Sequence, residues 1–142
     1  MPRRSPGAMR ARTRHRGPRP RPYSQIHGLG LSAQAAVHRL EARRFGPGYL
    51  SEALGQYEEF LRRPGRVLYV PLSDCPCHDV LGARDDIQAM LSALPPRARR
   101  ELGRIVARLD AEFERRTLPD PHAYRRRAYS RFDWWYQRLI GP

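Results

Sequence analysis

The sequence predicts an all-α protein, a compact bundle of about five short helices over residues 32–142 behind a disordered basic N-terminal tail, residues 1–31. Apolar residues recur at helical spacing in several segments. Short turns marked by proline or glycine separate these segments. The helical part is long enough to bury one modest core, so we expect a single domain.

The tail is predicted from its charge and composition. The chain has a formal charge of +13 with histidine neutral, and it contains no lysine, so all 27 of its permanently charged basic side chains are arginines. Residues 1–40 carry +9 and residues 41–142 carry +4. Residues 1–22 hold eight arginines and five prolines, and their only aliphatic side chains are alanine and methionine. Such a segment cannot bury enough apolar surface to offset its ordering entropy.

Two helices are predicted in the first half of the domain. The first runs from its cap at Ser32 to about Arg44, with an apolar face of Ala33, Ala36, Val37 and Leu40. The second ends before Pro64-Gly65, and its apolar face consists of Leu50, Ala53, Leu54, Tyr57 and Leu61. Residues 66–70 are predicted to be a short extended connector, because one strand cannot form a sheet.

Three further helices are predicted after this connector. The third covers about 85–94, with Asp85 and Asp86 interpreted as acids of its first turn. The fourth, about 97–116, has the clearest apolar face: Leu102, Ile105, Val106, Leu109 and Phe113. The last, about 128–139, places four residues on one side: Phe132, Trp135, Tyr136 and Leu139.

The fourth predicted helix also carries a run of arginines. Arg97 lies in its first turn, and Arg100, Arg104 and Arg108 follow at four-residue spacing. Like charges at this spacing repel by roughly a few tenths of a kcal/mol, and cations near a helix N-terminus oppose the helix dipole. Such a local conflict can mark a functional surface. The alternative is that Glu101 and acids of neighbouring elements neutralise these arginines.

Arginines and aromatic residues alternate near the C-terminus, a combination that single-stranded nucleic acid binding uses. The candidate contacts there are Arg125, Arg126, Arg127 and Trp134. The alternative is that the aromatic face of this helix belongs to the core. Trp134 points about 100° away from Trp135 on an α-helix, so we expect Trp134 to be the exposed tryptophan.

A candidate zinc site consists of Cys75, Cys77 and His78, whose thiolates and imidazole suit this metal. Three distant histidines are available to complete the coordination: His27, His38 and His122. Structural zinc sites usually contain two separated ligand pairs, and this sequence has one. We therefore predict no cofactor, with zinc as the alternative and the two cysteines otherwise as small, partly buried residues.

Several activities are excluded or disfavoured by the sequence. Without lysine, neither a Walker-type phosphate loop nor Schiff-base catalysis is possible. No nucleophile with a base, no paired catalytic carboxylates and no dinucleotide fingerprint is recognised, so we predict a protein that is not an enzyme. No apolar run approaches the roughly 20 residues that span a bilayer. We expect a cytoplasmic protein without a membrane partner.

Two parts of the sequence resemble known proteins. The segment 93–99 resembles the helix junction that opens the DNA-binding region of bacterial sigma factors, but an acidic stretch, 109–114, stands where a recognition helix is required. Helix-turn-helix recognition is therefore rejected. The motifs Cys75-Pro76-Cys77, Leu94-Pro95-Pro96-Arg97 and Trp134-Trp135 resemble small uncharacterised actinobacterial proteins, a likeness that implies no activity, ligand or partner.

The sequence thus favours a non-enzymatic protein whose arginine surfaces bind a polyanion, with nucleic acid ahead of an acidic protein partner. One alternative is a protein-interaction or structural module that docks through its aromatic C-terminal helix. Another is a small zinc-stabilised domain. The arginines of the fourth helix decide among these, since the first hypothesis fails if carboxylates neutralise them.

Overall fold

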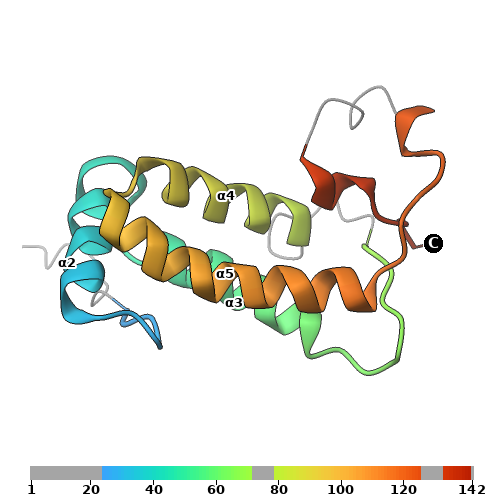
Figure 1. Cartoon of the computed structure of the whole chain (residues 1–142), viewed down its shortest axis with the longest axis horizontal. Helices are drawn as coiled ribbons and strands as arrows, with labels where there is room; N and C mark the ends of the chain where they lie inside the picture. The colour runs from blue at the N-terminus through green and yellow to red at the C-terminus, as the bar shows by residue number, and fades with distance from the viewer. Residues whose placement is uncertain (1–23, 72–78, 126–132, 142) are drawn as a thin grey trace, which may run out of the picture.

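The described part of the chain is all-α, as predicted, but it contains four α-helices rather than five. A computed structural model describes residues 24–71, 79–125 and 133–141. Its helices are α2 (Leu31–Leu40), α3 (Tyr49–Leu61), α4 (Val80–Ala93) and α5 (Pro96–Arg116). Figure 1 shows α3, α4 and α5 along the long axis and α2 across one end. Within these ranges, no helix combines the length and apolar character needed to cross a membrane.

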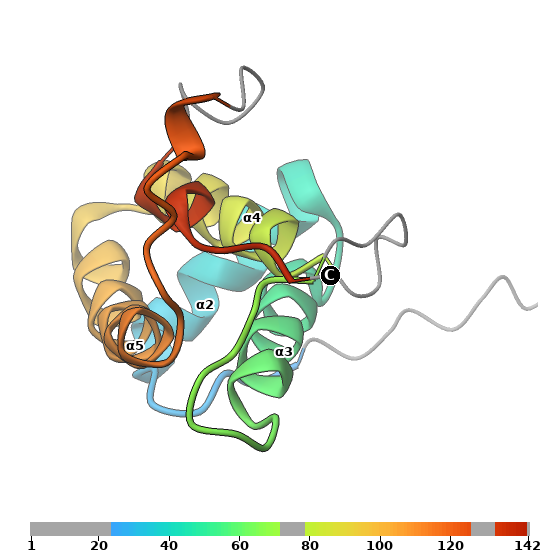
Figure 2. The same ribbon diagram turned by 90° about the vertical axis from the view of Figure 1, so that its right-hand side faces the viewer.

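The core lies between α3, α4 and α5, which surround it in the end-on view of Figure 2. The predicted apolar faces of α2 and α3 are buried, and on α5 only Leu109 is half-buried. The largest fully buried side chains come from all four helices and one connector: Val37, Leu50, Tyr57, Val70, Ile87, Met90, Leu94, Leu102, Val106 and Phe113. Helical apolar spacing therefore predicted the core of the bundle correctly.

A buried carboxylate shapes the junction between α2 and α3. The chain leaves α2 through a π-helical turn, Glu41–Phe45, and Gly46 and Gly48 then adopt positive φ angles of 91° and 79°. Glu41 is 2% exposed, and its carboxylate accepts the backbone N–H groups of Gly48 at 3.3 Å and Leu50 at 3.0 Å. It thus satisfies donors at the start of α3, which has no side-chain cap of its own.

Helix α4 begins five residues before the predicted start. Asp79 caps it, because its Oδ1 atom accepts the backbone N–H of Gly82 at 2.9 Å. Asp85 and Asp86 therefore lie in the second turn and beyond, and the interpretation of both as first-turn acids is wrong. The connection to α5 is short, and the guanidinium group of Arg99 donates to the carbonyl oxygens of Ser92 and Leu94 at the end of α4, each at 3.0 Å.

The described part of the fifth predicted helix is not α-helical. Residues 126–132 lie outside the described ranges, and residues 134–137 form a 3₁₀ turn instead of an α-helix. The chain then extends between two other segments, with hydrogen bonds from the Val70 N–H to the Leu139 carbonyl at 3.0 Å and from the Leu139 N–H to the Leu118 carbonyl at 2.8 Å. These tertiary backbone hydrogen bonds replace helical ones, and they also fix residues 66–70 as the expected extended connector.

The folded domain begins earlier than the predicted residue 32. Ile26 is buried, and its backbone N–H donates to the Gln34 side chain at 2.8 Å. Leu29 packs against the core, and the Gly30 N–H donates to Glu101 on α5 at 2.9 Å. Residues 24–30 are therefore part of the domain, whereas the remaining predicted tail, residues 1–23, lies outside the described ranges.

Candidate nucleic-acid interface

Three arginines form a line along the solvent-facing side of α5. Arg100, Arg104 and Arg108, called the arginine row below, are all exposed. Their Cα atoms advance by about 6 Å per step, because four residues of an α-helix rise by that length. The opposite face of α5 is buried in the core, with Leu102, Val106 and Phe113 fully enclosed. The same helical period that buries one face therefore presents the arginine row to solvent.

Within the described residues, no carboxylate forms an ion pair with the arginine row. Among the residues that the structure describes, five ion pairs are present, and none includes Arg100, Arg104 or Arg108. The alternative in which carboxylates bridge Arg100, Arg104 and Arg108 is therefore not observed within the described ranges.

Two acids of α5, Glu101 and Glu112, are held by other groups. Glu101, the nearest acid in the sequence, accepts the Gly30 N–H at 2.9 Å and lies 3.6 Å from Arg97. Glu112 is hydrogen-bonded by Arg115 at 2.6 Å, and this contact keeps the pKa of the Glu112 carboxyl below its ordinary value. Arg97, a candidate contact, is thus paired with Glu101, whereas the arginine row is not paired.

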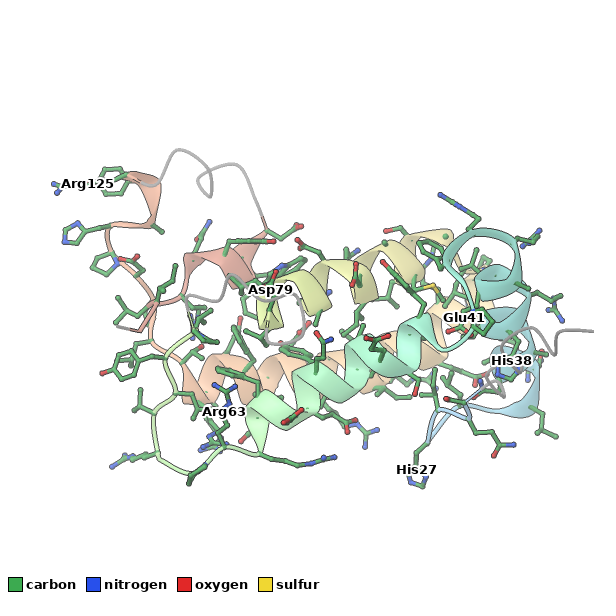
Figure 3. The ribbon with its side chains drawn as sticks, turned by 180° about the vertical axis from the view of Figure 1, so that it is seen from behind. His27, His38, Glu41, Arg63, Asp79 and Arg125 are labelled. Atoms are coloured by element: carbon green, nitrogen blue, oxygen red, sulfur yellow. The ribbon has the colours of Figure 1, made fainter. Side chains whose placement is uncertain are left out.

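A groove runs beside two members of the row. It has a volume of about 600 Å³ and lies between α5 and the segment that leads into α2. Arg104 and Arg108 line it together with uncharged and acidic positions: Gly28, Glu101, Ile105 and Ala107. Figure 3 shows His27, the neighbour of Gly28, pointing into solvent at this end of the molecule. The groove therefore combines positively charged side chains with apolar surface.

Trp134 differs from its predicted role. Its ring is half-buried and packs against the core, with its centre 6.0 Å from the centre of the Phe113 ring and 5.8 Å from that of Trp135. The expectation of an exposed stacking face assumed an α-helix, and the 3₁₀ turn instead directs this ring towards α5. Trp135, the residue expected in the core, is 3% exposed.

The other predicted C-terminal contacts are not brought to the arginine row. Arg125 is exposed, donates to the Tyr124 hydroxyl at 3.2 Å and lies at the end of the molecule opposite His27 (Figure 3). Arg126 and Arg127 lie outside the described ranges. The structure therefore places Arg100, Arg104 and Arg108 in one surface, with Arg97 beside it and Arg125 apart from it.

The candidate zinc ligands Cys75, Cys77 and His78 lie outside the described ranges. Asp79 follows them directly, and Figure 3 shows this residue well separated from His27 and His38. These two histidines are therefore not brought to the start of α4. In the portions of the chain that the structure describes, no group of three or more histidine, cysteine and acidic side chains is arranged to hold a metal ion.

A second cleft, of about 400 Å³, lies between α3 and α4 and is acidic. Two of its carboxylates are hydrogen-bonded within the fold: Asp86 accepts the Tyr49 hydroxyl at 2.5 Å, and Asp85 accepts the Trp135 indole N–H at 2.9 Å and the Tyr136 hydroxyl. Burial, helped by the hydrogen bond to Asp86, raises the pKa of Tyr49 to about 12. The hydrogen bonds of Asp85 and Asp86 therefore connect α4 to the C-terminal segment and to α3.

Sequence reasoning missed a buried polar network. Arg84 is buried on α4 and donates two hydrogen bonds to Asp110 of α5, each at 2.9 Å, while the Tyr57 hydroxyl donates to the same carboxylate at 2.9 Å. The guanidinium group of Arg84 also lies 4.1 Å from the centre of the Trp135 ring. The sequence contained a signal for this network. Arg84 precedes the buried Ile87 by three residues, and Asp110 precedes the buried Phe113 by three, so helical spacing places a cation on the apolar face of one helix and an anion on that of another.

Comparison with known proteins adds no family to these findings. No family model, no curated protein and no solved structure matches the chain. The resemblance to actinobacterial proteins therefore stays a prediction.

Proposed function

We propose that this protein is a non-enzymatic binder of nucleic acid and that the arginine row on α5 contacts the phosphate backbone. The single observation that carries this proposal is the exposure of Arg100, Arg104 and Arg108 without an ion pair to any carboxylate of the described residues. Guanidinium groups bind phosphate through paired N–H donors and keep their charge at every physiological pH.

The regular spacing of the row suits a repeating ligand. Steps of about 6 Å along α5 present cations in a line, as a chain of phosphates presents anions. A single small anion would need convergent donors, whereas these three side chains project side by side from one straight helix. A polyanion therefore fits the surface better than a free phosphate or carboxylate.

The described elements favour contacts to the backbone rather than to base edges. α5 continues unbroken to Arg116 and packs along its length against the other helices, so it does not project as a recognition helix does. Phosphate contacts position a protein without reading sequence. We therefore propose binding with little sequence preference, to which the eight arginines of residues 1–22 add a salt-sensitive attraction.

The alternative of docking through the aromatic C-terminus loses support from the packing. Trp135 is buried, Trp134 contacts Phe113, and Tyr136 donates to Asp85. These side chains are occupied within the domain and do not form an open aromatic surface. The arginine row, in contrast, is exposed and forms no ion pair within the described residues.

The test is a salt titration with labelled DNA and RNA of about 20 nucleotides, measured by fluorescence anisotropy. The triple variant Arg100→Gln, Arg104→Gln and Arg108→Gln removes the row. We expect the affinity to fall at least about tenfold and the slope of log K against log salt to become shallower by about 2 to 3, since each lost phosphate contact removes roughly one unit or slightly less.

The matched control removes the same charge from three other exposed arginines that form no ion pair within the described residues: Arg39, Arg43 and Arg66. Replacing these three with glutamine should change the affinity less than threefold. An equal loss in both triple variants would show a diffuse charge effect and contradict an oriented row. Equal competition by polyglutamate of matched charge would indicate an acidic protein partner instead, and absence of binding at low salt would refute the proposal.

A further inference from the structure

We infer that the groove beside Arg104 and Arg108 holds single-stranded nucleic acid, with phosphates on the two guanidinium groups and a sugar or base against the apolar floor. This inference rests on the proposed function and goes beyond it, because a row of arginines alone does not distinguish a single strand from a duplex. The groove adds shape and apolar surface to the charge.

The floor of the groove is apolar and is built by the fold. Ile105 is 9% exposed, so it is held by the core while one edge reaches the groove. Gly28 forms the facing wall with a φ angle of +92°, and a Cβ atom there would lie 3.5 Å from the Ile105 Cδ1 atom. Ala107, exposed on α5, leaves the groove open. A flat apolar ring or a sugar fits such a surface, whereas a phosphate does not.

Glu101 gives the groove a hydrogen-bond acceptor. Its side chain is 22% exposed, and it is fixed by the Gly30 N–H at 2.9 Å on Oε2 and by Arg97 at 3.6 Å on Oε1. A carboxylate repels phosphate, so a phosphate of a bound strand should lie at Arg104 or Arg108 and away from Glu101. Glu101 can accept hydrogen bonds from base amino groups or from sugar hydroxyls.

These groups favour a single strand over a duplex. In a duplex the bases are stacked inside, and only phosphates and sugars reach a surface as shallow as this one. In a single strand, a base next to a bound phosphate can turn towards Ile105 and Glu101. Electrostatics alone gives the opposite preference, because a duplex carries the higher charge density. A preference for single strands therefore reports on the groove rather than on charge.

The experiment compares three labelled probes of equal length, single-stranded DNA, single-stranded RNA and duplex DNA, on the full chain at one salt concentration. The variant Ala107→Leu fills the groove and leaves every charge in place. Ala111→Leu is the matched control, because Ala111 is exposed one turn further along α5 and does not line the groove. Leucine is a good helix former, and circular dichroism checks that both variants are folded.

We expect wild-type protein to bind at least one single strand more tightly than the duplex. Ala107→Leu should weaken single-strand binding about fivefold, in keeping with the loss of one base contact, and change duplex binding less than twofold. Ala111→Leu should change neither. Binding in which the duplex is preferred, or in which the two variants have equal effects, overturns this inference while the proposed function stands. Failure of all three probes to bind overturns both.

Discussion

The carboxylate of Asp110 on α5 accepts two parallel hydrogen bonds from the guanidinium group of Arg84 on α4, at 2.9 Å each. The side chains of the pair are 6% exposed for Arg84 and 18% for Asp110. Tyr57 of α3 donates to the same carboxylate, and Trp135 covers the guanidinium group. One ion pair therefore connects three helices and the C-terminal segment.

Breaking this pair from one side should destabilise the domain. In Asp110→Leu, Arg84 stays buried without its anion, and we expect the free energy of unfolding to fall by about 3 kcal/mol. The double variant Arg84→Met with Asp110→Leu should lose less than Asp110→Leu alone, because no unpaired charge remains. Urea unfolding followed by circular dichroism measures the free energy of unfolding of Asp110→Leu, Arg84→Met and the double variant. If the loss in the double variant equals the sum of the losses in the two single variants, the coupling is contradicted.

The fold should lose stability at alkaline pH. The pKa of Tyr49 is raised to about 12 by burial and by the hydrogen bond to Asp86, and burial beside Asp110 raises the pKa of Tyr57 as well. A tyrosine of the unfolded chain has a pKa of about 10. Above this pH the unfolded state has therefore lost phenol protons that the folded state retains. Stability from these groups is therefore complete below pH 10 and lost as the pH rises towards 12.

Urea unfolding at several pH values between about 8 and 11 tests this dependence. The double variant Tyr49→Phe and Tyr57→Phe cannot ionise at these positions. Its stability should be lower at pH 8, by about 1 kcal/mol for each lost hydrogen bond, but should fall less steeply above pH 10. Parallel pH curves for the variant and the wild type would show that the two tyrosines do not govern alkaline unfolding.

Trp134 should matter for stability and not for nucleic acid binding. Its ring packs against Phe113 and Trp135, so Trp134→Ala is expected to lower the free energy of unfolding by about 2 kcal/mol, whereas Trp134→Phe keeps an aromatic contact and loses less. Anisotropy titration at a temperature where both variants are folded should give affinities within twofold of wild type. A large loss of affinity in the folded Trp134→Ala variant would indicate that Trp134 contacts the nucleic acid directly.

The buried carboxylate of Glu41 should be necessary for the start of α3. Glu41→Ala leaves the N–H groups of Gly48 and Leu50 without their acceptor, and we expect a loss of about 2 kcal/mol. Glu52→Ala is the matched control, because Glu52 is an exposed acid in the first turn of α3. Thermal unfolding should give a lower melting temperature for Glu41→Ala than for Glu52→Ala. Similar melting temperatures would show that the start of α3 does not depend on Glu41.

The sequence predicted those parts of the fold that depend on local periodicity. The apolar spacing of Leu102, Val106 and Phe113 marks a buried helix face, and the structure buries all three. The last segment was predicted wrongly because its conformation depends on distant partners. The Val70 and Leu118 backbones hold residues 138–141 extended, and Asp85 holds Trp135, and none of these contacts leaves a periodic signal.

The candidate site was predictable in part for the same reason. The four-residue spacing of the arginine row was enough to place Arg100, Arg104 and Arg108 on one exposed face of a helix. The groove was not predictable, since its second wall, Gly28, comes from a segment that was assigned to the tail. Tertiary hydrogen bonds bring that segment to the bundle: the Ile26 N–H donates to Gln34 of α2, and the Gly30 N–H donates to Glu101 of α5.

The tight connection between α4 and α5 has a consequence for the order of folding. The two helices are neighbours in sequence, and Arg99 fastens the end of one to the start of the other through contacts only five and seven residues apart. Closing so small a loop is fast and costs little chain entropy. The turn between α4 and α5 should therefore form early, before α4 packs against α3, the helix with which it makes most of its contacts.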